Sequence, residues 1–327
     1  MFRTELIPEI EPAGISHHNG ILAIGSCFAE HIGGRLQAAK FNTSINPFGI
    51  LYNPASIAYT LERLWEGRPY TQEDLFENQG IWHSFDHHGR LSSHNLEQAL
   101  HNINEALRQG SEALHRADRL LITLGTANVF VWKEDRRMVA NCHKLPGAAF
   151  NRYRLSVNEV IDLLSPIFEL LHQAQPQLHI ILSVSPVRHL RDGFVENQRS
   201  KATLLLATEE LCRRHDFAHY FPAYELLMDD LRDYRFYDTD MIHPAPVAVD
   251  YIWERFSDSY FSPQTRQLMA AVKKISEAAA HRPFHPDSEP HRRFVEKLQL
   301  DIEAMEQEYP FLNFADEKER ILINSQP

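Results

Sequence analysis

Ser26 is the first residue in this sequence with the features of a nucleophile. It comes directly after the apolar run ILAIG (21–25), and from Phe28 onward the apolar residues have helical spacing. A serine hydroxyl attacks a carbonyl only when a base takes its proton, and a neutral imidazole is the usual base near neutral pH. His243 is the candidate base. Asp240, three residues earlier in DMIHP, is the candidate carboxylate that would fix its tautomer. We therefore predict Ser26, Asp240 and His243 as the catalytic residues of an acyl-transfer reaction.

Acyl transfer also needs N–H donors that stabilise the oxyanion, each worth about 3 kcal/mol in the transition state. Three groups are candidates: the backbone N–H of Ser26, the backbone N–H of Gly49 in the turn NPFGI, and the side-chain amide of Asn128. Three further residues in or near loops are candidates for contacts with the substrate, namely Gly125, His143 and Arg188.

Several of these residues have alternative interpretations. Cys27 could be the nucleophile at a helix N-terminus, but a small buried side chain beside Ser26 is the favoured interpretation. His143 fits a structural hydrogen bond at the end of a hairpin as well as a substrate contact, and Arg188 fits an anchor for a loop carboxylate equally well. A group of histidines in one loop suggests a metal, but their spacing is irregular and no carboxylate-rich motif accompanies them: His83, His87, His88 and His94. We expect a solvated or substrate-facing cluster, no metal and no cofactor.

The elements that must position these residues alternate between strand and helix. Apolar runs predict strands at 21–25, 41–45, 119–125, 178–186 and 219–223, with helices between them, including one over 156–173 that starts with the capping box of Ser156 and Glu159. Such alternation predicts a three-layer α/β sandwich with a parallel sheet covered on both faces. Ligands bind beyond the carboxyl ends of parallel strands, so the candidate residues should meet at one edge of the sheet.

Two segments interrupt this alternation, 80–94 and 129–142, and we predict both as hairpins with polar tips. From Arg282 the sequence changes to a linker rich in proline and histidine, followed by an amphipathic helix. We therefore expect a catalytic domain over 1–281 and a linker with a helical extension over 282–327. The amphipathic helix offers a surface for self-association into a homo-oligomer.

Composition excludes several classes of partner. The chain has 327 residues, 43% of them hydrophobic, which is enough for a full core, and its net charge is −11. Without a run of Lys and Arg, we expect neither a nucleic acid nor an anionic membrane as partner. No apolar stretch reaches the roughly 18 residues of a membrane span. Three widely spaced cysteines fit neither a disulfide framework nor a paired metal motif, so we expect a cytoplasmic protein.

The segment ILAIGSCFAEHIG resembles the defining motif of the GSCFA family, which is similar to the SGNH or GDSL hydrolases. Further segments resemble other blocks of that family in the same order: INPFGILYNP, LITLGTANVFVW, ANCHKLP, LSVSPVRHLRDG and DTDMIHP. The resemblance implies a flavodoxin-like sheet. It places Ser26 at the hydrolase serine, Gly49 in the second block, Gly125 and Asn128 in the third, and Asp240 with His243 in the last. The usual GDS is GSC here, and the usual GxND is GTAN.

From the residues and the resemblance together, we expect a serine esterase that acts on an acetylated sugar or another small polar ester through an acyl-Ser26 intermediate. Two alternatives stay open. One is an O-acyltransferase with the same three catalytic residues. The other is a noncatalytic module that binds a carbohydrate or a protein on the same scaffold, although such a module would not need all three residues together.

Overall fold

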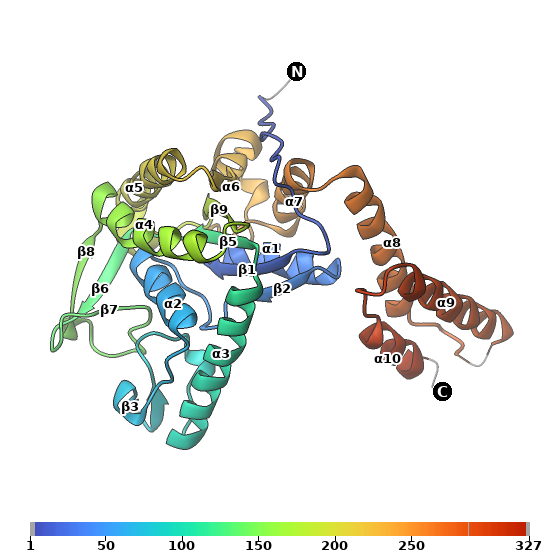
Figure 1. Ribbon diagram of the computed structural model, residues 1–327, viewed down its shortest axis with the longest axis horizontal. Helices are drawn as coiled ribbons and strands as arrows, with labels where there is room; N and C mark the ends of the chain where they lie inside the picture. Colours follow the sequence, from blue (N-terminus) through green and yellow to red (C-terminus); the bar gives the residue numbers. More distant parts are fainter. Residues whose placement is uncertain (1–3, 287, 325–327) are drawn as a thin grey trace.

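The five predicted strands form one parallel sheet in the computed structural model, which describes residues 4–286 and 288–324 (Figure 1). The strand order β10-β9-β5-β1-β2 is the flavodoxin-like order of a doubly wound α/β fold. The strands are β1 (Gly20–Gly25), β2 (Asn42–Ile45), β5 (Arg119–Leu124), β9 (His179–Val184) and β10 (Ala218–Tyr220). The predicted fold class is therefore confirmed.

Helices cover both faces of this sheet, because alternate residues of its strands are apolar on each side. Leu22 and Ile24 of β1 join the cluster that packs on one face against α2 (Pro54–Glu66), α3 (Leu96–Arg116), α4 (Val157–Ala174) and α5 (Gly193–Arg214). Ile21 and Ala23 join the cluster on the other face, against α1 (Cys27–Ala38) and α7 (Pro246–Tyr260). The result is a three-layer sandwich with two separate cores.

Antiparallel strands extend beyond the central sheet, close to the expected hairpins but not at their predicted bounds. The first hairpin pairs β3 (Phe76–Asn78) with β4 (Ile81–His83), earlier than the predicted 80–94. The second hairpin, β6 (Asn128–Trp132) with β7 (Met138–Val139), lies within 129–142 apart from its first residue. A third strand, β8 (Phe150–Arg154), pairs with β6 along its whole length. Polar residues at four of the five β8 positions explain why the apolar pattern did not predict this strand.

Short helical turns connect these elements. The 3₁₀ helices are η1 (Gln72–Asp74), η2 (Gly89–Leu91), η3 (Gly147–Ala149), η4 (Leu190–Asp192) and η6 (Tyr234–Phe236). A one-turn helix, α6 (Ala223–Glu225), continues into the π-helix η5 (Leu226–Leu231), which precedes the loop of Asp240 and His243.

The C-terminal helices form a unit with its own small core, at the right of Figure 1. They are α8 (Pro263–Ala280), α9 (Glu289–Glu308) and α10 (Ala315–Asn324). The amphipathic helix expected after Arg282 is α9, whereas α8 lies before the expected boundary at 281 and packs with α9 and α10. A salt bridge of 2.6 Å between Lys40 and Glu317 joins this unit to the turn after α1.

Candidate active site

Loops that follow several strands meet at the carboxyl edge of the central sheet. The carbonyl of Tyr52, after β2, accepts the backbone N–H groups of Gly125 and Thr126, after β5, at 2.8 and 2.9 Å. After β9, the backbone N–H of Arg188 donates to the carbonyl of Ile242 at 3.3 Å. The loop that carries Asp240 and His243 is therefore held at the same edge as the turn after β1, as expected for a doubly wound sheet.

Asp240 and His243 form the hydrogen-bonded pair that their spacing predicts. The Oδ2 of Asp240 lies 2.6 Å from the Nδ1 of His243. Its Oδ1 accepts the backbone N–H groups of Ile242 and His243 at 2.8 and 2.9 Å. The backbone N–H of His243 lowers the pKa of Asp240 most, and the His243 side chain and the Ile242 N–H add to this effect, so that the pKa is about 2. An ionised carboxylate thus fixes one imidazole nitrogen and leaves the other free for chemistry.

Ser26 lies at the junction of β1 and α1, but its side chain does not reach the surface. It is the N-cap of α1, and its Oγ accepts the backbone N–H of Phe28 at 3.3 Å. Its exposed fraction is 0%. Its backbone N–H donates to the carbonyl of Thr123 at 3.1 Å and so continues the ladder between β1 and β5. Ser26 is built into the end of the sheet.

The three predicted oxyanion donors all have acceptors within the protein. The Ser26 N–H is bound to Thr123, as described. The Gly49 N–H donates to the carbonyl of Asn46 at 2.8 Å in a turn that needs glycine, since its φ is +86° and a Cβ there would lie 2.2 Å from the Cβ of His88. The amide of Asn128 donates to Asp192 at 3.3 Å. The arrangement expected from the sequence, with three free donors at one point, is therefore not present in this structure.

Gly125 and Arg188, two of the predicted substrate contacts, lie at the carboxyl edge. A Cβ on Gly125 would lie 3.1 Å from both the carbonyl of Tyr52 and the Nε2 of His189, so the close approach of these groups needs glycine. The guanidinium of Arg188 stacks over the ring of Tyr237, 4.1 Å from its centroid. Arg188 therefore lies next to the loop of His243, and Gly125 lies where the loops after β2 and β9 meet.

His143, the third predicted substrate contact, lies in a buried cluster under the hairpins. Its Nε2 lies 2.7 Å from the carbonyl of Ser84, and its ring stacks on His83 with centroids 4.3 Å apart. Burial lowers the pKa of His143 to about 4. The ring of His87 is buried too, and burial lowers its pKa to about 3. Within the described ranges, no group of three or more His, Cys, Asp or Glu side chains is placed to hold a metal ion.

Three residues at the carboxyl edge were not predicted from the sequence: Tyr52, His189 and Lys201. The buried ammonium of Lys201 donates to the carbonyls of Gly125 and Ser185 at 2.7 and 2.6 Å, and thereby ties the ends of β5 and β9 together. Burial lowers the pKa of Lys201 to about 7. The rings of Tyr52 and His189 meet edge to face with centroids 5.3 Å apart. A lysine within a helical pattern normally indicates a solvated face, so no local pattern predicts Lys201 at this position.

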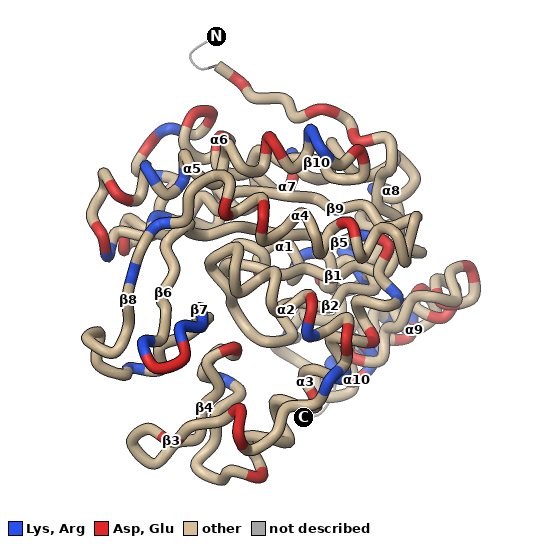
Figure 2. The backbone as a smooth tube through the Cα atoms, turned by 60° about the vertical axis from the view of Figure 1, so that its left-hand side comes forward, with Lys and Arg blue, Asp and Glu red and all other residues tan. Residues whose placement is uncertain are grey.

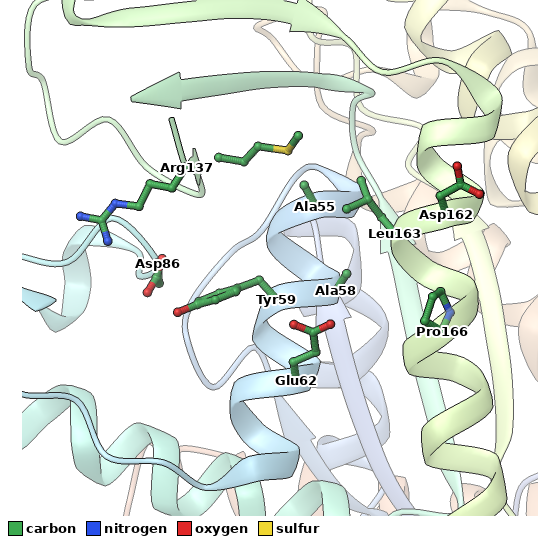
Figure 3. Close-up of a pocket in the computed structure, with 10 residues that line it drawn as sticks. Ala55, Ala58, Tyr59, Glu62, Asp86, Arg137, Asp162, Leu163 and Pro166 are labelled. Atoms are coloured by element: carbon green, nitrogen blue, oxygen red, sulfur yellow. The ribbon is translucent and has the colours of Figure 1, made fainter. Parts of the chain in front are cut away.

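Two pockets lie near these loops. One, of about 400 Å³, is lined by Arg188, Tyr234 and Tyr237 and so borders the loop that carries His243. The other, of about 450 Å³, lies between α2, α4 and β7 (Figure 3). In Figure 3 the hydroxyl of Tyr59 points toward Asp86, which faces Arg137, while Asp162 lies across the pocket on α4. The lining of this second pocket contains none of the predicted catalytic residues.

Figure 2 shows Lys and Arg interspersed with Asp and Glu along the backbone, in keeping with the net charge of −11. Among the helices of residues 4–286 and 288–324, none combines the length and the apolar character that a membrane span requires.

Comparison with protein families gave two matches. The model of the GSCFA family matches residues 20–256, which include the whole central sheet and the loop of Asp240 and His243. The model of the GSCFA domain protein, C-terminal domain, matches residues 272–324, which include α9, α10 and part of α8. Comparisons with curated proteins and with solved structures found no match.

Proposed function

The chain belongs to the GSCFA family, and from this membership and the geometry of the site we propose that it hydrolyses small polar acyl esters through a covalent acyl-enzyme intermediate. The proposal includes a relationship to SGNH hydrolases, which is supported by the resemblance of the motif ILAIGSCFAEHIG. The expected substrates are acetylated sugars or other small neutral esters.

The pairing of Asp240 with His243 is the observation that carries the proposal. An Asp carboxylate that accepts two backbone N–H groups and one imidazole N–H has a fixed orientation, and it fixes the imidazole in turn. Such a pair prepares His243 to take a proton from a nucleophile and return it to a leaving alcohol. A purely structural histidine needs no ionised partner of this kind.

The turn between β1 and α1 supplies the nucleophile in this proposal. Ser26 and Cys27 are adjacent there, and both carry an atom that can form an acyl intermediate. The turn also starts a helix, and although the N–H groups of Phe28 and Ala29 are bound to Ser26, the positive end of the helix dipole favours negative charge there. An oxyanion formed at this turn would therefore lie at the positive end of α1 even though the predicted donors are bound elsewhere.

The pocket beside Arg188 suits a small polar ester. Its volume of about 400 Å³ and its lining of Arg188, Tyr234 and Tyr237 offer aromatic faces together with charged donors. Sugars bind commonly to aromatic faces flanked by polar groups, and an acyl chain of a few carbons would fit the remaining space.

Turnover of a panel of acyl esters and acetylated sugars by wild type, His243→Ala and Asp240→Asn tests the proposal. We expect His243→Ala to reduce kcat/KM by about 10³-fold or more, and Asp240→Asn to do nearly as much, because the two groups act as a unit. Asp238→Asn is the matched control, since the Asp238 carboxylate accepts the backbone N–H of Thr239, while the His243 imidazole pairs with Asp240. Equal turnover in wild type and His243→Ala would overturn the proposal.

The same panel separates the alternatives. Addition of acceptor alcohols would shift the product from the free acid to a new ester if the chain is an O-acyltransferase. Binding of a glycan without turnover of any ester would favour the noncatalytic module.

The three cysteines are unpaired, which fits the cytoplasmic location expected from the sequence.

A further inference from the structure

We propose that the thiol of Cys27, rather than the hydroxyl of Ser26, carries the acyl group, so that the covalent intermediate is a thioester. This inference rests on the proposed function and names the nucleophile of the same site. It predicts a chemical property of the intermediate that a serine ester lacks, and this property can be measured independently of the rate.

Ser26 is poorly placed to attack a substrate. Its exposed fraction is 0%, its Oγ caps the Phe28 N–H and its own N–H continues the sheet ladder to Thr123. For its Oγ to attack a carbonyl carbon, the N-cap bond from the Phe28 N–H would be lost, at a cost of about 1 kcal/mol. These contacts give Ser26 a complete structural role as a helix cap.

Cys27 has the opposite position. It is the first residue of α1, and its side chain is partly exposed rather than fully buried. Residues four apart lie on one face of a helix, so Cys27 and His31 share a face of α1. That face is directed toward the helix that follows the loop of His243, because Arg35, four residues after His31, donates to Asp250 on α7. The proposed base and the thiol therefore lie on the same side of α1.

Polar groups from other elements surround Cys27. Burial raises the pKa of its thiol and Glu30 raises it further, whereas the Phe28 N–H, the Lys201 ammonium and the Cys27 N–H lower it. The thiol thus stays protonated until a base takes its proton, which is the role proposed for His243. The positive end of the α1 dipole and the charged form of Lys201 stabilise the negative charge that forms during attack.

His189 contributes a buried polar atom without a partner at the same edge of the sheet. Its Nε2 is buried, and within the described part of the chain it has no hydrogen-bond partner. This nitrogen lies against Gly125, and the His189 ring packs against Tyr52, whose neighbour Leu51 donates its N–H to the carbonyl of Gly25 at the turn that carries Cys27. A buried imidazole nitrogen without a partner is costly. An oxygen of a bound ester would satisfy it.

The reaction balances without a further reagent. The Cys27 sulfur attacks the ester carbonyl carbon while His243 takes the thiol proton. The C–O bond then breaks, and the alcohol leaves with the proton from His243. Water next attacks the thioester carbon, His243 takes the proton of that water, and the C–S bond breaks to return the thiolate, which regains its proton. Each turnover consumes one ester and one water and yields one alcohol and one acid.

Trapping of the intermediate with p-nitrophenyl acetate tests the inference. The full-length chain is mixed with this ester, quenched in acid, digested and sequenced by mass spectrometry, with and without neutral hydroxylamine, which cleaves thioesters but spares oxygen esters. Wild type, Ser26→Ala, Cys27→Ala and Cys27→Ser are compared. Cys212→Ala, which removes a thiol on α5, is the control for background acetylation.

We expect hydroxylamine-labile acetyl on Cys27 in wild type, in Cys212→Ala and in Ser26→Ala. Cys27→Ala should lose it together with about 10³-fold in turnover. Ser26→Ala should lose less than about tenfold, since only a helix cap is removed. In Cys27→Ser the acetyl should become resistant to hydroxylamine, which shows the site even if the alanine variant folds poorly.

Acetyl on Ser26, with turnover retained in Cys27→Ala, would overturn this inference and leave the proposed ester hydrolysis intact. Acetyl on neither residue, with no turnover of any ester in the panel, would overturn both. The two failures therefore give different results.

Discussion

Lys201 shows how much of the site depends on a single buried charge. Lys201 is 1% exposed, and its ammonium donates to two carbonyls at the ends of neighbouring strands. Those carbonyls belong to Gly125 and Ser185, which begin the loops that lead toward Asn128 and His189. A lysine at this point satisfies buried acceptors, and in its charged form it lowers the pKa of the Cys27 thiol.

Replacement of Lys201 should change how stability depends on pH. Burial lowers its pKa from 10.5 to about 7, although Cys27 opposes this shift. Between these two values the unfolded chain binds more protons than the folded chain, so Lys201 makes the free energy of unfolding rise with pH by up to about 1.4 kcal/mol per unit. Urea denaturation at pH 7 and 8.5 should show this rise in wild type and in Lys133→Met, an exposed control. The rise should be smaller in Lys201→Met, and equal slopes in both variants would contradict the assigned pKa.

At the residue scale, the sequence predicted what is local and failed where partners are distant. Asp240 and His243 are three residues apart in one turn, so their hydrogen bond follows from spacing. The Ser26 N–H and the Asn128 amide are bound by Thr123 and Asp192, which lie far away in the sequence.

Helix α1 positions the proposed nucleophile through its contact with β2. Two adjacent glycines in this helix have different surroundings. A Cβ on Gly33 would lie 2.8 Å from two side-chain carbons of Ile45, whereas a Cβ on Gly34 would meet nothing within 4 Å. Only Gly33 lets the helix approach the edge strand this closely.

Alanine at these two positions should therefore have opposite effects. Gly34→Ala should raise the free energy of unfolding by about 0.5 to 1 kcal/mol, because alanine loses less backbone entropy in a helix. Gly33→Ala should lower it by about 1 to 3 kcal/mol, because Ile45 or the helix must move. Urea denaturation of both variants measures the difference. Stabilisation by both substitutions would show that the contact of α1 with β2 is loose.

Among the elements, the sequence predicted those with a continuous apolar run. β1, β5 and β9 were located within two residues at each end, since each is buried on both faces. α3 (Leu96–Arg116) was not predicted, although its buried residues recur at the intervals of three and four that are typical of an amphipathic helix. The C-terminal α8 was not predicted either, and its packing with α9 involves contacts that no local pattern indicates.

On the scale of the whole molecule, the chain contains two kinds of polar interior. One is the carboxyl edge with Lys201 and His189. The other lies beneath the hairpins, where His87 and His143 are buried among aromatic rings. Burial lowers the pKa of His87 to about 3, of His143 to about 4 and of His189 to about 4. All three are therefore neutral in the folded protein at any pH above about 5.

Mild acid should destabilise the whole fold through these histidines. Below the ordinary histidine pKa of 6.5 the unfolded chain takes up protons that the folded chain does not, so the free energy of unfolding falls as the pH drops from 6.5 toward about 4. Each such residue contributes up to about 1.4 kcal/mol per pH unit, or about 2 kcal/mol at pH 5.

His87→Phe keeps a ring next to Phe48 but cannot take up a proton, so it should lose less stability than wild type between pH 7.5 and 5. The matched control is His94→Phe, at an exposed histidine of the same loop, and it should show the wild-type loss. Urea denaturation at both pH values measures these differences. An identical loss in wild type and His87→Phe would mean that His87 takes up its proton in the folded state as readily as in the unfolded chain.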